Sequence, residues 1–200
     1  MALSLYNKKR NFKETSEPSG KLKKSESKLA FVIQRHKASR LHYDFRLEMD
    51  GVLKSWAVPK GPSLNPKDKR LAMMVEDHPY DYKDFEGIIP QGNYGGGIVE
   101  IWDSGTYIDI DNSERDVAIK KLKAGLKSGD FKFQLFGKKL KGEFVLVKLK
   151  AKEDNSWLLI KHKDKYAVDT EYSSEDETLK NSPINKWLSE NKNPVKKKST

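Results

Sequence analysis

Residues 41–48, LHYDFRLE, alternate apolar and polar side chains without a break. This two-residue period predicts a β-strand with one buried face and one polar face. The polar face carries four side chains that a merely solvated strand does not need: His42, Asp44, Arg46 and Glu48. Imidazoles and carboxylates bind metals, and a guanidinium binds phosphate. The stretch therefore predicts both a strand and a functional site on one of its faces.

Most of the chain consists of short strand-like segments separated by turn signals. The expected strands are residues 31–36, 41–49, 52–58, 71–75, 98–102, 106–110, 130–136, 143–149 and 156–161. Asp50 and Gly51 predict a two-residue hairpin, and residues 103–105 (DSG) predict a turn between two strands. This pattern predicts a mainly β protein, an antiparallel β-barrel of about eight strands with one or two peripheral helices.

Two segments have helical character. Ser113 is suited to cap a helix whose apolar residues recur every three or four positions, and Gly129 is suited to end it. Residues 183–191 predict a second, short helix around Ile184 and Trp187. Both helices are expected at the periphery of the barrel.

Composition predicts three parts. Hydrophobic residues make up 36% of the chain, which is low for a fully packed domain. We expect an N-terminal arm over residues 1–30, a barrel domain over 31–168, and a partly disordered tail over 169–200 whose end, 194–200, is disordered.

The composition also excludes several classes of protein. No apolar run reaches the roughly 18 residues of a membrane span, the N-terminus has no signal-peptide core, and cysteine is absent. We therefore expect a cytoplasmic monomer without disulfides. The net charge of +10 suits a polyanionic partner such as a nucleic acid, although a lysine surplus also serves solubility alone.

The histidines suggest a metal site. Of four histidines, His36, His42 and His78 lie in or near the expected strands of residues 31–78. A lone histidine is usually structural, but His36 lies beside His42 and Asp44 if their strands pair. Two imidazoles and one carboxylate form a three-ligand set with open positions, suited to Mn²⁺, Zn²⁺ or Fe²⁺.

Three kinds of function compete for this set. Arg46 follows the ligands on the same face, and Lys60, Arg70 and His78 lie at strand ends or in nearby loops. A metal surrounded by cations favours phosphate-ester chemistry. An iron oxygenase with two histidines and one carboxylate is the main chemical alternative, but it leaves the cations without a role. Noncatalytic binding is the third reading.

Two weaker signals have simple structural explanations. Residues 92–97, GNYGGG, lack the lysine and the following helix of a phosphate-binding loop, so they favour a flexible turn. Four aromatic residues are candidates for stacking on bases: Trp56, Tyr82, Tyr94 and Trp102. Most aromatic residues of a small β domain belong to its core, so the sequence selects none of them.

Several longer motifs occur in order along the chain: residues 31–36 (FVIQRH), 40–48 (RLHYDFRLE), 55–62 (SWAVPKGP), 75–79 (VEDHP), 85–87 (FEG), 94–97 (YGGG) and 157–161 (WLLIK). Together they resemble the 3′-phosphoesterase domain of bacterial DNA ligase D. The resemblance covers roughly residues 8–168. The chain has no room for ligase or polymerase domains, so it is similar to the stand-alone form of this domain in archaea and some bacteria.

The resemblance implies a metal-dependent enzyme that heals DNA 3′ ends at a primer–template. A phosphodiesterase step removes a 3′-terminal ribonucleoside and leaves a 3′-phosphate, and a phosphomonoesterase step removes that phosphate to leave a 3′-OH. Mn²⁺ is the implied cofactor, with Zn²⁺ or Co²⁺ as alternatives. A DNA ligase and other end-joining proteins are the implied partners. The alternative is a noncatalytic barrel that binds DNA ends or a repair partner.

The resemblance also implies residue roles. The metal ligands are His36, His42 and Asp44. Arg46 and His78 contact the scissile phosphate, and His78 stabilises the transition state or protonates the leaving oxygen. Further candidates around the substrate are Lys60, Arg70, Tyr82, Gln34 and Glu76.

The N-terminal arm departs from the family pattern. Arg10 and Glu17 match the family's arm motif and are expected to reach the active site. Asn11 stands where the family usually has an aspartate, so a carboxylate is missing. Because the arm serves chiefly the nucleoside-removing step, this departure bears on the phosphodiesterase activity.

Overall fold

The computed structural model describes residues 3–23, 28–150 and 155–191. The strands in these ranges are β1 (Leu29–Lys37), β2 (Leu41–Met49), β3 (Val52–Val58), β4 (Arg70–Met74), β5 (His78–Pro79), β6 (Gly87–Ile89), β7 (Gly97–Asp109), β8 (Asp130–Gly137), β9 (Lys141–Lys148) and β10 (Ser156–Lys161). The helices are α1 (Ser4–Lys8), α2 (Arg115–Ser128) and α3 (Pro183–Asn191), with a 3₁₀ helix, η1 (Tyr80–Asp84).

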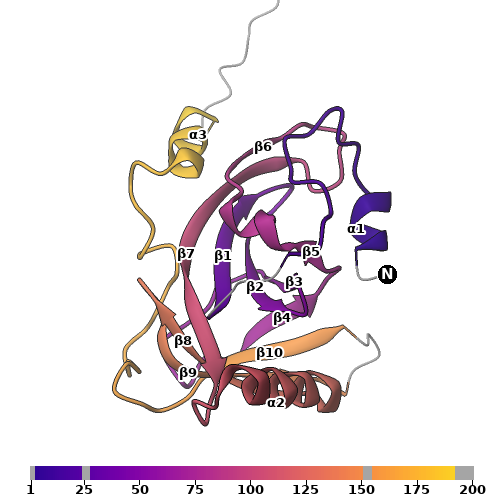
Figure 1. Cartoon of the computed structure of the whole chain (residues 1–200). Helices are drawn as coiled ribbons and strands as arrows, with labels where there is room; N and C mark the ends of the chain where they lie inside the picture. Colours follow the sequence, from indigo (N-terminus) through magenta and orange to yellow (C-terminus); the bar gives the residue numbers. More distant parts are fainter. Residues whose placement is uncertain (1–2, 24–27, 151–154, 192–200) are drawn as a thin grey trace, which may run out of the picture.

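The strands form a closed antiparallel barrel (Figure 1). Their order is β1-β2-β3-β4-β10-β9-β8-β7, and β1 pairs with both β2 and β7, which closes the ring. The two short strands, β5 and β6, pair with β3 and β7. The eight-stranded barrel with peripheral helices confirms the predicted fold class.

Alternation along β1 separates two apolar clusters. Phe31 and Ile33 belong to the cluster inside the barrel, whereas Val32 belongs to a second cluster with Tyr6 and Tyr82. The arm and η1 therefore cover the outer face of β1 and its neighbours. Cross-strand partners share a face, so Gln34 and His36, which follow Val32 on the same face of β1, lie on this covered outer face together with their partners on β2.

The turn predicted at residues 103–105 is wrong. β7 continues through these residues as one strand of 13 residues. Asp103 is buried and accepts backbone N–H groups of the β8–β9 turn, from Lys138 at 2.9 Å and Leu140 at 2.8 Å. At Gly105, a Cβ atom would come within 2.2 Å of the Phe136 carbonyl oxygen. These residue types are common in turns, but here they serve contacts of β7 with β8 and with the β8–β9 turn.

The helix ends also correct the sequence analysis. Helix α2 begins one residue later than predicted, with Glu114 at the N-cap position, and the Ser113 hydroxyl donates instead to Asp109 at 2.8 Å. Gly129 ends the helix with φ of 82°, as predicted. Helix α3 matches the predicted residues 183–191. Helix α1 was not predicted.

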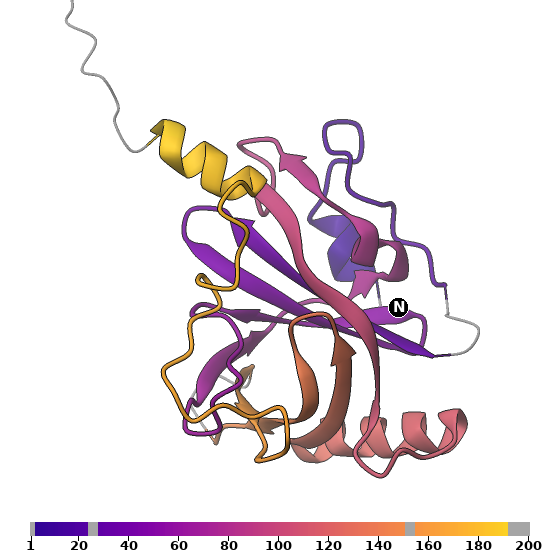
Figure 2. The ribbon, with the colours of Figure 1, turned by 90° about the vertical axis from the view of Figure 1, so that its left-hand side faces the viewer.

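The segment after β10 runs along the outside of the barrel to α3 (Figure 2). Ser174 is buried, and Arg35 of β1 donates to Glu175 at 2.9 and 2.6 Å and to Asn185 at 2.9 Å. The division into arm, domain and tail stays a prediction, and the disorder expected for residues 194–200 lies outside the described residues. Within the described ranges, no helix is long and apolar enough to cross a membrane.

Candidate active site

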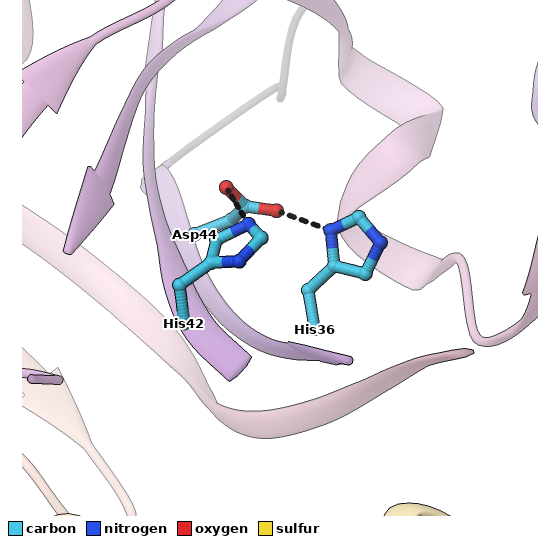
Figure 3. A group of neighbouring side chains, drawn as sticks. All are labelled: His36, His42 and Asp44. Carbon is cyan, nitrogen blue, oxygen red and sulfur yellow. Dashed lines mark ion pairs between the residues drawn. The ribbon is translucent and has the colours of Figure 1, made fainter. Parts of the chain in front are cut away.

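Pairing of β1 with β2 assembles the predicted ligand set (Figure 3). His36 lies opposite His42 in the ladder, and Gln34 lies opposite Asp44. His36 Nδ1 is 3.5 Å from Asp44 Oδ2, and His42 Nε2 is 3.6 Å from Asp44 Oδ1. The nearest ligand atoms of the three residues all lie within 4.8 Å of one another. The strand pairing expected from the sequence is thus confirmed.

Backbone carbonyls orient both imidazoles. His36 Nε2 lies 2.9 Å from the Gly95 oxygen, and His42 Nδ1 lies 3.0 Å from the Arg40 oxygen. A carbonyl only accepts hydrogen bonds, so each of these nitrogens carries the proton. In the neutral rings, the nitrogens that face Asp44 therefore present lone pairs.

Asp44 is ionised at neutral pH. Burial raises the pKa of its carboxyl, but the Arg46 charge and the contact with His36 lower it by more, so the pKa lies well below its usual value. Arg46 Nη2 donates to Asp44 Oδ2 at 3.0 Å. The three-residue group therefore combines two imidazoles with one anionic carboxylate.

Arg46 is held with one nitrogen unused. Its Nε donates to Gln34 Oε1 at 2.7 Å, and its guanidinium carbon lies 4.8 Å from the centre of the Tyr82 ring. Gln34 is in turn fixed by bonds of 2.9 Å from its Nε2 to the Tyr82 and Phe85 carbonyls. Nη1 of Arg46 is buried and finds no hydrogen-bond partner among the described residues. A buried cationic N–H without a partner is costly, so it points to an anionic ligand.

His78 lines the same hollow as Arg46. Its Nδ1 is 2.9 Å from the Glu76 carbonyl oxygen, and its Nε2 is 3.2 Å from Arg10 Nη2. Because arginine only donates, Nε2 accepts this bond. Burial, followed by the charges of Arg46 and Arg10, holds the pKa of His78 well below its usual value, so the ring is neutral near pH 7.

The arm reaches this group through buried contacts. Arg10 Nε donates to Glu17 Oε1 at 2.9 Å, and the same oxygen accepts the Tyr82 hydroxyl at 2.8 Å. Arg10 also stacks over Tyr6 of α1, with its guanidinium carbon 3.8 Å from the ring centre. Asn11 instead donates to Glu14 of the arm at 2.7 Å. The structure therefore brings Arg10 and Glu17 to the other candidates, and Asn11 holds the arm's own turn.

These groups line one hollow of about 280 Å³. Its walls include Arg10, His36, His42, Asp44, Arg46, Glu76, His78, Tyr82, Tyr94 and Gly95. The sequence analysis did not identify Lys9 as a site residue, although it donates hydrogen bonds to both Glu76 at 3.0 Å and Tyr94 at 3.1 Å. Tyr6 was also missed, and its position four residues before Arg10 is the one signal that relates the two.

A family model described as the DNA ligase D 3′-phosphoesterase domain matches residues 34–148, more than half of the chain. The chain belongs to this family. The residues that line the hollow from His36 to Gly95 fall within the matched region, whereas Arg10 of the arm precedes it.

Curated relatives of this phosphoesterase domain are multifunctional non-homologous end joining proteins named LigD. That of Pseudomonas aeruginosa is 49% identical over 165 residues, which are 81% of this chain and 19% of the relative. That of Mycolicibacterium smegmatis is 42% identical over 164 residues, 81% of this chain and 21% of the relative. That of Mycobacterium tuberculosis H37Rv is 43% identical over 147 residues, which are 73% of this chain and 18% of the relative. The chain thus spans about a fifth of the length of these relatives.

Two residues that were predicted to bind substrate do not line the hollow of the candidate metal ligands. Lys60 and Arg70 line a separate hollow, and Arg70 donates to Asp68 and to the Tyr172 carbonyl, both at 2.8 Å. Their role in substrate binding stays a prediction. A larger hollow of about 490 Å³ lies beside α2 and β7, and its lining includes none of the candidate metal ligands.

The ligand set of the phosphoesterase domain fits a divalent metal. Its three groups present two imidazole lone pairs and one carboxylate toward a common point, and the carbonyl contacts of both histidines are the outer hydrogen bonds usual for metal-bound imidazoles. Nitrogen and oxygen donors of this kind suit Mn²⁺, Zn²⁺, Fe²⁺ or Co²⁺ alike.

Proposed function

We propose that this chain is a metal-dependent DNA 3′-end-healing phosphoesterase that acts on a primer–template. It removes a 3′-terminal ribonucleoside and then the remaining 3′-phosphate, leaving a 3′-OH. The observation that carries the proposal is the unpartnered, buried Nη1 of Arg46, next to a three-residue metal-ligand group in the same hollow. This combination suits a tetrahedral phosphate better than any neutral ligand.

The metal would be held by His36, His42 and Asp44, with Mn²⁺ as the expected ion. A divalent metal at this position supplies Lewis acidity, which stabilises negative charge on a phosphoryl oxygen. Arg46 donates from Nη1 to the phosphate, and Gln34 keeps the guanidinium in place for it. Arg10 adds a second positive charge from the arm.

In the first step, water attacks phosphorus and the bond from phosphorus to O5′ of the terminal ribonucleoside breaks. The departing oxygen needs a proton, and His78 is the one histidine lining the hollow that is outside the ligand group. Burial and, after it, the charges of Arg46 and Arg10 lower the pKa of His78, so the ring is neutral in the free protein. The negative charge of a bound phosphate opposes that effect and raises the pKa of His78, so that Nε2 gains a proton it can donate. In the second step, water attacks the 3′-phosphate and the bond from phosphorus to O3′ breaks, which releases inorganic phosphate.

Lys60 and Arg70 are proposed to contact the nucleic acid beyond the scissile phosphate, since they line a separate hollow together with a third cation, Lys69. Support for a DNA end as the substrate comes from the relatives, which are named as non-homologous end joining proteins. A DNA ligase and other end-joining proteins are the proposed partners.

The decisive experiment uses labelled primer–templates that end in one ribonucleotide or in a 3′-phosphate. Each is incubated with the protein and Mn²⁺, with EDTA, and with the variants His42→Ala and His162→Ala. His162 is the matched control because it lies outside the hollow, beside Glu143 at 3.6 Å. We expect shortening of the first end and dephosphorylation of the second. Both activities should disappear in EDTA and in His42→Ala but persist in His162→Ala.

The alternative function is a noncatalytic barrel that binds DNA ends or a repair partner. In that case, the folded protein should bind DNA but convert neither end, whichever divalent metal is added. Turnover that survives both EDTA and His42→Ala would also refute the proposal.

A further inference from the structure

Tyr94 differs from the other aromatic residues that are candidates for stacking on bases. Trp56, Tyr82 and Trp102 are buried, with exposed fractions of 0%, 2% and 4%, whereas Tyr94 is 47% exposed. Tyr94 also lines the hollow that contains the metal-ligand group. Among these four candidates, it is the one whose ring is available to a ligand.

The loop that carries Tyr94 is attached to the site. The carbonyl oxygen of Gly95 accepts the hydrogen bond of His36 Nε2 at 2.9 Å, so Tyr94 precedes the residue that orients a candidate metal ligand. Gly95 has φ of +77°, a conformation that other residues rarely adopt. The backbone therefore turns at Gly95 to meet His36.

The arm holds the ring from another direction. Lys9 Nζ donates to the Tyr94 hydroxyl at 3.1 Å and lies 4.4 Å from the ring centre, and the Arg10 guanidinium carbon lies 5.6 Å from it. Asn93 of the same loop donates to Glu14 of the arm at 3.3 Å. The arm and the glycine-rich loop (residues 92–97) therefore meet beside the hollow that Tyr94 lines, and Tyr94 remains 47% exposed.

We propose that Tyr94 forms a nucleobase subsite by stacking on the base of the 3′-terminal ribonucleoside. The inference rests on the proposed function and makes it more specific. An exposed aromatic ring beside phosphate-binding groups is the arrangement by which proteins hold single nucleotides without reading their sequence. A ribonucleotide end presents a base next to the scissile phosphate, whereas a 3′-phosphate end has lost that nucleoside. Tyr94 therefore serves the nucleoside-removing step and has no partner in the phosphate-removing step.

The test compares Tyr94→Ala and Tyr94→Phe with the wild type on three primer–templates, in the presence of Mn²⁺. The ends are a 3′-ribonucleotide, a 3′-terminal ribose that lacks its base, and a 3′-phosphate. Tyr166→Ala is the control, because Tyr166 is 38% exposed but packs beside Gly142, away from the hollow. The quantity measured is kcat/KM for each end.

We expect Tyr94→Ala to lower kcat/KM about tenfold on the ribonucleotide end, chiefly through KM, because that is the usual effect of removing one stacking partner. Removal of the 3′-phosphate should be unchanged. On the abasic end, wild type and Tyr94→Ala should be equally slow. Tyr94→Phe should behave as the wild type, since it keeps the ring.

A second readout needs no metal and no turnover. A primer that ends in the fluorescent base 2-aminopurine, bound in EDTA, should be quenched by the wild type and by Tyr94→Phe but not by Tyr94→Ala. Equal losses of Tyr94→Ala on the ribonucleotide end and on the 3′-phosphate end, or a loss in Tyr94→Phe as large as in Tyr94→Ala, would overturn the inference while leaving the proposed function in place. Wild-type protein that is inactive on both ends would overturn the proposed function and this inference with it.

Discussion

Arg46 donates a hydrogen bond of 3.0 Å from Nη2 to Oδ2 of Asp44, two residues before it on the same face of β2. The same carboxylate oxygen lies 3.5 Å from His36 Nδ1. One carboxylate therefore connects the residue expected to bind phosphate with the group expected to bind metal. A change at Asp44 should affect both functions, whereas a change at Arg46 should affect the phosphate more than the metal.

Replacing Asp44 by asparagine should weaken metal binding. The variant keeps the side-chain shape but loses the anionic ligand, and we expect Mn²⁺ affinity to fall by at least about tenfold. Titration calorimetry of the metal measures this. Asp68→Asn is the matched control. Asp68 also accepts a hydrogen bond from an arginine two residues later, Arg70, at 2.8 Å, but both residues line a different hollow. Equal Mn²⁺ affinity in wild type and Asp44→Asn would rule out the proposed ligand set.

Replacing Gln34 by leucine should release Arg46. The change leaves Arg46 Nε and two backbone carbonyls without their partner in a buried place, so we expect a loss of about 1–3 kcal/mol in the free energy of unfolding. Inhibition by inorganic phosphate should weaken as well. Gln134→Leu on β8 controls for the residue type. Unaltered phosphate inhibition in a destabilised Gln34→Leu protein would reduce Gln34 to a packing role.

His78 should make the free protein less stable in acid. Its pKa is lowered in the folded state, chiefly by burial, from an ordinary value of 6.5. Below that pH the unfolded chain binds a proton that the folded protein does not, so stability falls as pH decreases. In EDTA, the wild type should lose up to about 1.4 kcal/mol more per pH unit than His78→Gln. Parallel stability curves from urea unfolding at pH 7.5 and 5.5 would contradict the neutral, buried imidazole.

Glu17→Gln should loosen the arm. Arg10 and Glu17 have side chains that are 4% and 1% exposed, and breaking a buried pair of this kind costs about 3–5 kcal/mol. We expect faster proteolysis within the arm and a larger loss of nucleoside removal than of phosphate removal. Asp81→Asn is the control, since its pair with Lys23 of the arm is exposed and screened by solvent. Identical cleavage patterns in both variants would show that the arm docks by other contacts.

Glu175→Ala should release the segment between β10 and α3. Glu175 accepts two hydrogen bonds from the buried Arg35 and one from the Tyr43 hydroxyl. Without it, Arg35 retains Glu100 at 2.9 Å, so we expect a lower melting temperature and new protease cleavage after residue 163, but an intact barrel. The exposed Glu177→Ala is the control. Protection of this segment in Glu175→Ala would refute its anchoring role.

Local sequence patterns predicted the parts of the site that lie on neighbouring strands. The two-residue period placed His42, Asp44 and Arg46 on one face, and Asp50 and Gly51 predicted the hairpin, where both adopt positive φ, 53° and 80°. They did not predict the long strand β7, because residues 103–105 have turn-forming side chains that serve contacts with β8 and the turn after it.

By itself, the sequence determined the barrel class, the family and the face of β2 that carries His42, Asp44 and Arg46. Only the tertiary structure decided that the arm and the glycine-rich loop meet over that face, that His78 is flanked by Arg10, and that Tyr94 is the exposed aromatic residue. The physical reason is that periodicity and turn chemistry act over a few residues. The contacts of Lys9 with Tyr94 and of Arg35 with Glu175 join segments 85 and 140 residues apart, and they depend on closure of the barrel and on what covers its outer face.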